Sequence, residues 1–195
     1  MRHKFINRKT FYAWNALVVS DDNLKIRWLS CDRAGSVHDS RMWNESRLKA
    51  MLIESYNPAR PLALIGDKGF PCSKVLLTPK KDNQIRSQAD IEYNECLCKP
   101  RVLCEHCYGV WKKRFPAILY TLRKDSQEYS QATIFASAVL HNIAIELNED
   151  KPTVPSSIDE GMFNELFAES QENGEFVGEE NDTHLRDQII NNFFT

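Results

Sequence analysis

Two acidic residues are placed where a metal-dependent reaction would need carboxylates. Asp67 follows the short apolar run at residues 62–65, with one glycine between them, and is predicted to lie at the carboxyl end of a buried strand. Ligands of open α/β sheets gather at that end of the strands. The competing interpretation is a turn aspartate in Asp-Lys-Gly, which the local sequence on its own favours.

Glu105 is the second candidate and lies in a predicted helix. It falls opposite the apolar stripe of that helix and shares a face with Arg101, Tyr108 and Lys112. A carboxylate surrounded by cations suits a site where the acid holds a metal and the cations hold phosphates. A surface ion pair with Arg101, contributing about 0.2–0.5 kcal/mol, is the preferred interpretation when Glu105 is taken alone. The apolar stripe consists of Leu103, Cys107, Val110 and Trp111.

A third acid, Asp39, lies beside His38 at a predicted loop–helix junction. Asp39 has the residue type of a helix N-cap and needs no further role. His38 is a candidate ligand or proton carrier, although a single histidine at such a junction is more often structural. Local sequence alone therefore assigns no chemistry to either residue.

A cluster of cysteines indicates a different chemistry. Cys96, Cys98, Cys104 and Cys107 place four soft ligands within 12 residues, and His106 is a fifth candidate. Tetrahedral zinc needs four such ligands. Cys107 also belongs to the apolar stripe, where it is predicted to be a small core residue. A zinc-stabilised interaction domain is therefore the less favoured alternative.

The elements that must position these residues predict an α/β fold with a mixed sheet. Their boundaries follow from apolar periodicity, turn residues and prolines. In the helix at about 128–147, the core-facing stripe is predicted to be Ala132, Ala136, Val139, Leu140, Ile143 and Leu147. The predicted elements are a β-hairpin at 11–20 and 24–32, helices at about 40–54, 87–113 and 128–147, a buried strand at 62–65, a flexible acidic linker at 149–183, and a short helix at 184–194.

Composition limits the class of protein. The 195 residues suffice for one domain with its own core, and no apolar run is long enough to span a bilayer. No secretory signal is visible, so the six cysteines are expected in a reducing compartment. Residues 1–145 carry 23 basic against 14 acidic side chains, whereas residues 146–195 carry 2 against 13. A basic body with an acidic tail suits a polyanion partner, and equally a solvated surface with a solubilising tail.

Taken together, seven segments resemble the endonuclease domain of PIF/Harbinger-type transposases and the domesticated nuclease derived from them. They occur in collinear order over nearly the whole chain. The resemblance implies a ribonuclease-H-like α/β fold with a mixed sheet, flanking helices and a DDE triad of acids. The matching segments are residues 7–15, 35–41, 64–71, 77–79, 105–115, 139–143 and 186–190.

The resemblance assigns roles to the candidate acids. Asp67 matches the second triad acid, Glu105 the third, and Asp39 a signature acid that is a candidate metal ligand. The first acid of the family lies in a strand motif, Asp-Gly-Thr-His, which does not occur in this sequence. We therefore expect the first strand to be missing, either because the chain is an incomplete copy or because the protein no longer cuts DNA.

The resemblance also implies cofactors and partners. Mg²⁺ or Mn²⁺ would be held by Asp67, Glu105 and Asp39, and DNA by Arg101, Lys112, Lys113 and Arg114. A nuclear location and a Myb/SANT-like partner are expected, and no membrane association. The predicted organisation is an endonuclease domain at 1–148, the linker at 149–183 and a C-terminal helix at 184–195. The runner-up function is a non-catalytic module that binds nucleic acid or protein.

Overall fold

The computed structural model describes residues 13–118, 127–150 and 182–194, and these residues form a mixed α/β structure, as predicted. The strands of the described residues form two separate two-stranded sheets, one antiparallel and one parallel, in place of the single mixed sheet that was expected. The chain divides into two compact units. One comprises Met1–Val37 with Val102–Leu166, and the other His38–Arg101 with Phe167–Thr195. The long helix α3 (Gln88–Arg114) contributes its first half to the second unit and its second half to the first. Pro100, which withdraws one helical hydrogen bond, lies inside α3 next to this division.

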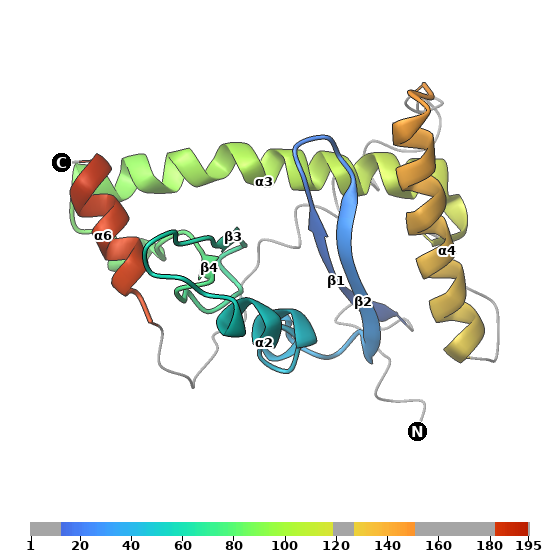
Figure 1. Cartoon of the computed structure of the whole chain (residues 1–195), viewed down its shortest axis with the longest axis horizontal. Coiled ribbons are helices and arrows are strands. Elements are labelled where there is room, and N and C mark those ends of the chain that lie inside the picture. Colours follow the sequence, from blue (N-terminus) through green and yellow to red (C-terminus); the bar gives the residue numbers. More distant parts are fainter. Residues whose placement is uncertain (1–12, 119–126, 151–181, 195) are drawn as a thin grey trace. The chain divides into compact units, whose positions relative to one another are not determined.

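The first unit is built on the predicted β-hairpin, whose strands β1 (Trp14–Ser20) and β2 (Ile26–Ala34) pair antiparallel (Figure 1). The carboxylate of Asp21 accepts the backbone N–H groups of Asn23 and Lys25, at 3.0 and 2.9 Å, and so stabilises the turn. Leu24 adopts a positive φ of 63° there, while its side chain is buried. Burial of this side chain offsets the backbone strain.

Helix α4 (Gln127–Glu146) lies beside β2 (Figure 1), and its last turns pin the hairpin. The side-chain amide of Asn142 accepts the N–H of Ile26 at 2.8 Å and donates to its carbonyl at 2.9 Å. The Nε2 atom of the fully buried His141 lies 2.8 Å from the carbonyl of Leu24. Two residues of the 139–143 segment thus hold the hairpin in place. Burial lowers the pKa of His141, so the ring is kept neutral.

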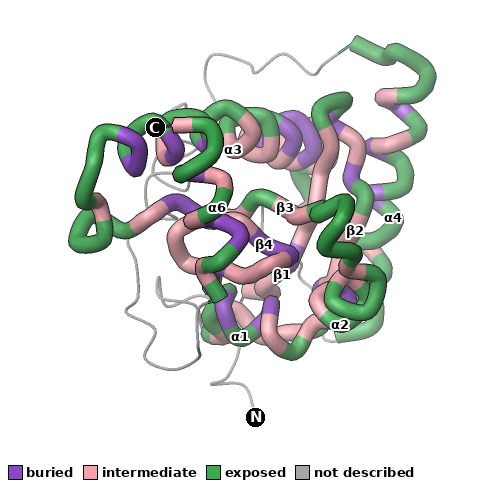
Figure 2. The backbone as a smooth tube through the Cα atoms, turned by 60° about the vertical axis from the view of Figure 1, so that its left-hand side comes forward, coloured by how far each residue is buried: buried purple, intermediate pink, exposed green. Residues whose placement is uncertain are grey.

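The predicted core face of α4 is wrong. Val139, Leu140, Ile143 and Leu147 are exposed, and small or polar residues face the hairpin instead. The buried side of α4 makes polar contacts with its neighbours, which apolar periodicity does not encode: the hydroxyl of Ser137 accepts the indole N–H of Trp111 at 3.1 Å. Figure 2 shows buried and exposed positions alternating along α4. The buried residues of α4 are Ser130, Ile134, Ser137, Ala138, His141 and Ala144.

The second unit begins with two short helices where one was predicted. Helices α1 (Asp39–Asn44) and α2 (Arg47–Glu54) are separated at Ser46, whose hydroxyl caps α2 by accepting the N–H of Lys49 at 3.1 Å. An internal N-cap residue ends one helix and starts the next, a signal that apolar periodicity does not carry.

The predicted strand at 62–65 is shorter and more exposed than expected. β3 (Leu64–Ile65) pairs parallel with β4 (Leu76–Leu77), while Leu62 is 80% exposed and Ile65 41% exposed. After β4, a 3₁₀ turn η2 (Asp82–Gln84) leads to α3, and a second one, η3 (Pro116–Ile118), follows α3 in the first unit.

The C-terminal helix α6 (His184–Phe193) is present as predicted and packs on the first half of α3. Ile190 belongs to the apolar cluster around Tyr93, and Phe194 packs against this cluster. The rings of Phe194 and Tyr93 meet edge-on, with their centroids 6.2 Å apart. The predicted flexible linker falls largely on 151–181, outside the described residues. Along the described segments, no helix has the length and apolar character needed to cross a membrane.

Candidate functional site

Asp67 lies directly beyond the end of β3, as predicted, and its carboxylate is partly exposed. Gly66 before it donates its N–H to the carbonyl of Leu77 at 2.9 Å, which prolongs the β3–β4 pairing up to the acid. The Asp67 carboxylate accepts the guanidinium of Arg101 at 2.9 Å. Asp67 also begins a turn, because its carbonyl accepts the N–H of Phe70 at 3.0 Å, so the turn-aspartate interpretation is confirmed and the ion pair with Arg101 is present as well.

A largely buried hydrogen-bond network lies at the start of α3. The carboxylate of Asp90 accepts Lys80 Nζ at 2.5 Å and the N–H groups of Arg86 and Ser87 at 2.7 and 3.1 Å. The Lys80 hydrogen bond, with these amides, lowers the pKa of Asp90 to about 2. The side-chain amide of Asn94 accepts the backbone N–H of Lys80 at 2.8 Å and donates to its carbonyl at 3.0 Å. The segment after β4 is thereby fixed to α3.

Glu105 is half-buried and follows Arg101 by one helical turn of α3, so the two side chains share a face of that helix. Tyr108, three positions later, donates its hydroxyl to the carbonyl of Val18 in β1 at 3.0 Å. Glu105 therefore lies on the side of α3 that is turned toward β1. The apolar stripe on the other side is confirmed for Cys107, Val110 and Trp111 but is wrong for Leu103, which is 40% exposed because the core cluster starts one turn later.

Asp39 is exposed and is the first residue of α1, and the prediction that it is the N-cap is wrong. His38 occupies the N-cap position in extended backbone conformation, and its side chain makes no capping hydrogen bond. The preceding loop is fixed by Gly35, whose N–H donates to the carbonyl of Ala13 at 2.8 Å. A Cβ at Gly35 would lie 2.8 Å from that same carbonyl oxygen, so the close approach requires glycine.

The predicted DNA-binding cations lie on α3, and Arg101 and Arg114 among them hold acids or carbonyls of this chain. Arg114 ion-pairs with Glu149 at 3.6 Å and donates to the carbonyl of Asp150 at 3.3 Å. Arg101 holds Asp67. Burial lowers the pKa of Lys112. Lys113, like Lys112, is half-buried.

The cysteine cluster lies on the single helix α3, and its members differ in environment. Cys107 is fully buried, and its thiol donates to the carbonyl of Leu24 at 3.2 Å. Burial raises the pKa of Cys107 to about 12, which disfavours the thiolate that zinc requires. The core role predicted for Cys107 is confirmed. Over the described ranges, no group of three or more His, Cys, Asp or Glu side chains is arranged to hold a metal ion.

Alkylation of the native protein is expected to separate these thiols. Cys96 and Cys98 are exposed and should react with iodoacetamide first, whereas Cys31 and Cys107 should react only after unfolding, because both are buried and have raised pKa values. Peptide mass spectrometry reads out each site. Protection of Cys96 and Cys98 that is lost on adding a chelator would instead support the zinc alternative.

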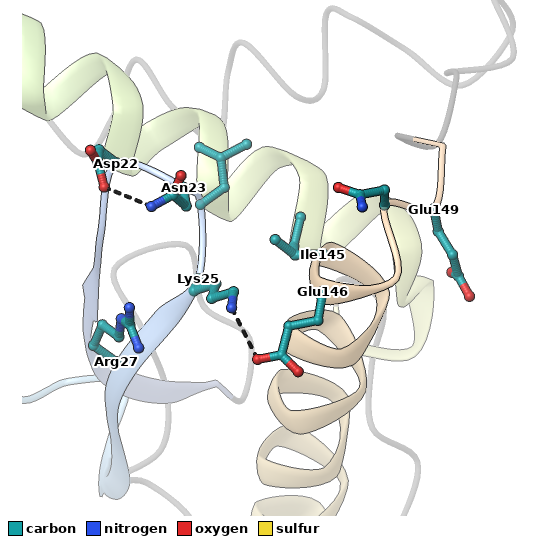
Figure 3. A pocket seen from close by; sticks show the side chains of 9 residues that line it. Asp22, Asn23, Lys25, Arg27, Ile145, Glu146 and Glu149 are labelled. Carbon is teal, nitrogen blue, oxygen red and sulfur yellow. Dashed lines mark hydrogen bonds and ion pairs between the residues drawn. The ribbon is translucent and has the colours of Figure 1, made fainter.

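A cleft of about 630 Å³ in the first unit lies between the hairpin turn and the end of α4. Lys25 reaches across it to Glu146 at 3.0 Å, while Asp22 bonds the neighbouring Asn23 (Figure 3). The cleft is lined by charges of both signs and contains none of the predicted site residues. Sequence reasoning missed it because hairpin turn and helix end are far apart in the chain.

Comparison with known families identifies the family of the chain. The family model described as DDE superfamily endonuclease matches residues 1–142. The chain belongs to the DDE superfamily endonucleases. No curated protein and no solved structure showed significant similarity to it. The matched range contains Asp39, Asp67 and Glu105, together with the cations of α3.

Membership in the DDE endonuclease family accounts for features that the local sequence left open. Endonucleases of this family generally use divalent metals, and a nuclease domain implies that DNA is bound. The ion pair between Asp67 and Arg101 had no sequence signal, because pairing of residues so far apart in the chain depends on the path of the loop after β3.

Proposed function

We propose that this chain carries part of the catalytic site of a PIF/Harbinger-type, transposase-derived DNA endonuclease. In this proposal Asp67 and Glu105 are the second and third acids of the triad, and Asp39 is a further metal ligand. The observation that carries it is the position of Asp67, at the end of β3 and ion-paired with the helix that bears Glu105.

The donor atoms of these acids are of the type that Mg²⁺ and Mn²⁺ bind, while the described residues do not bring three such side chains together around one point. Both ions prefer carboxylate oxygens, and Asp67 and Glu105 are only partly buried. One oxygen of Asp67 holds Arg101, so a bound ion would share this carboxylate with the guanidinium or displace it. When bound, a pair of such ions activates water and stabilises the leaving oxygen of a phosphodiester.

DNA would be held by the cations of α3. Four cations lie on α3 with Glu105: Arg101 comes one turn before it, and Lys112, Lys113 and Arg114 come about two turns after it. The guanidinium groups of the two arginines bind phosphate in bidentate geometry. Arg101 and Arg114 already hold anionic or carbonyl oxygens of this chain, so phosphate would compete with those partners. A ribonuclease-H-like arrangement of the sheets, a nuclear location and a Myb/SANT-like partner belong to the same proposal.

A non-catalytic module that binds nucleic acid or protein is the second candidate function. Two observations favour it: the Asp-Gly-Thr-His motif does not occur in these residues, and Asp67 is engaged by Arg101. Such a module would keep the scaffold and its cations but would need no metal.

Binding of Mn²⁺ distinguishes the two candidates. Replacing Asp67 by asparagine is expected to weaken Mn²⁺ binding by about tenfold or more, because a neutral amide replaces an anionic oxygen ligand. Isothermal titration calorimetry measures the affinity. Glu105→Gln should act in the same direction, and the double variant should lose less than the two single effects combined, since both acids would bind one ion.

Asp82→Asn is the matched control, because Asp82 is an exposed carboxylate whose partner is Lys68 at 3.2 Å. Its Mn²⁺ affinity should equal that of the unmodified chain. Equal affinity in the Asp67→Asn variant would favour the non-catalytic module.

A further inference from the structure

The exposed face of α4 is apolar along most of its length. Phe135, Val139, Leu140, Ile143 and the adjoining Leu147 expose between 43% and 67% of their surface. Ala132 and Ala136 lie among them and are also exposed. These seven residues are called the α4 apolar face. The face is separate from the candidate metal site, which uses residues of α3 and of the loop after β3.

The size of the α4 apolar face exceeds what scattered surface residues explain. Its five large side chains leave on the order of 400 Å² of apolar area in contact with water. Removing such an area from water contributes about 25 cal/mol per Å², so covering it is strongly favoured. The hairpin packs on the opposite side of α4, through Ile134 and Ala138, so this packing leaves the apolar face uncovered.

The shape and charge of the face suit a second copy of itself. Phe135, Val139 and Ile143 are spaced by four residues and form one ridge. Beside it, Ala132 and Ala136 leave room for large side chains from a facing helix. Between Glu128 and Glu146 the exposed positions carry no charged side chain, so two copies would meet without repulsion at the centre.

We propose that two copies of this chain associate through the α4 apolar face, with their α4 helices antiparallel about a two-fold axis near Val139. Such an interface is isologous, the commonest arrangement in homo-oligomers. The apolar side chains of two copies and the residues around them would bury about 1,000 Å², the lower limit for a specific interface. An interface at this lower limit is expected to be weak, so association is sought at micromolar concentrations.

Sedimentation velocity of the full chain over about 1–200 µM tests this proposal. The weight-average mass should rise with concentration from that of a monomer toward that of a dimer. Val139→Glu places two carboxylates next to each other at the axis and should raise the dissociation constant at least about tenfold. Met51→Glu, at a comparably exposed apolar position of α2, should leave it unchanged.

Circular dichroism checks that both variants are folded. The concentration series of the unmodified chain tests the proposal even if a variant fails to fold. A mass that stays monomeric over the whole range would overturn the proposal. This result is expected if other residues of the same chain cover the face. Association that Val139→Glu leaves unchanged would also overturn it, because the interface would then lie elsewhere.

Discussion

A preparation of these 195 residues is expected to nick supercoiled plasmid no faster than its Asp67→Ala variant, in either Mg²⁺ or Mn²⁺. Only two acids of the proposed triad occur in the sequence, and the bridging acid between two ions is not among them. Without this acid, neither ion is firmly held, so the activation free energy of cleavage is expected to be several kcal/mol higher than in a complete site. Each 1.36 kcal/mol lowers the rate about tenfold.

Gel electrophoresis of the plasmid at several times reads out the nicking rate. Robust nicking by the unmodified chain that disappears in the Asp67→Ala variant would contradict the expectation. In that case another acid completes the site, and Asp32 and Asp39, which lie near the exit of the hairpin, are the residues to substitute next.

Replacing Asp90 by asparagine is expected to lower the free energy of unfolding by about 3–5 kcal/mol, because it leaves the Lys80 ammonium without its buried partner. The side chain of Asp90 is 4% exposed and that of Lys80 15%. Total stabilities are only about 5–15 kcal/mol, so this change is large. Urea unfolding measures it, and adding Lys80→Met should recover part of the loss.

The exposed Asp82→Asn variant is the control for the Asp90 prediction and should change stability by less than about 1 kcal/mol.

The ionisation of Asp90 also makes the free energy of unfolding depend on pH. Its pKa is lowered to about 2 in the folded chain, so the unfolded chain takes up the proton first as the pH falls. The stabilisation from Asp90 is complete above about pH 4 and is lost toward pH 2. A stability of the Asp90→Asn variant equal to that of the Asp82→Asn variant would contradict the account.

The elements with strong local patterns could be predicted from the sequence. The hairpin is specified by aromatic and β-branched residues on both sides of the turn at Asp21, and α3, α4 and α6 follow helical periodicity. The core face of α4 could not be predicted, because which side of an apolar helix is covered depends on the neighbour it packs against. Ser137 and His141 face the core because each has a hydrogen-bond partner in another element. The partner of Ser137 is the indole of Trp111, and that of His141 is the carbonyl of Leu24.

The local positions of the candidate residues were predictable, but their contacts were not. Asp67 at a strand end and Glu105 on a polar helix face are patterns of the local sequence. Arg101 as the partner of Asp67, and Asp90 as the anchor of α3, depend on loop paths that no periodicity encodes. The α4 apolar face illustrates the same limit, because the stripe was correctly recognised while its exposure was not.

The central claim is that Asp67 and Glu105 converge on one divalent-metal site. A crystal structure of the chain grown in Mn²⁺, with the ion located by its anomalous scattering, tests this claim most directly. The account predicts an anomalous peak within bonding distance of both carboxylates, about 2.0–2.2 Å from their oxygens. Carboxyl groups more than about 10 Å apart, beyond the reach of a shared pair of ions, would contradict it.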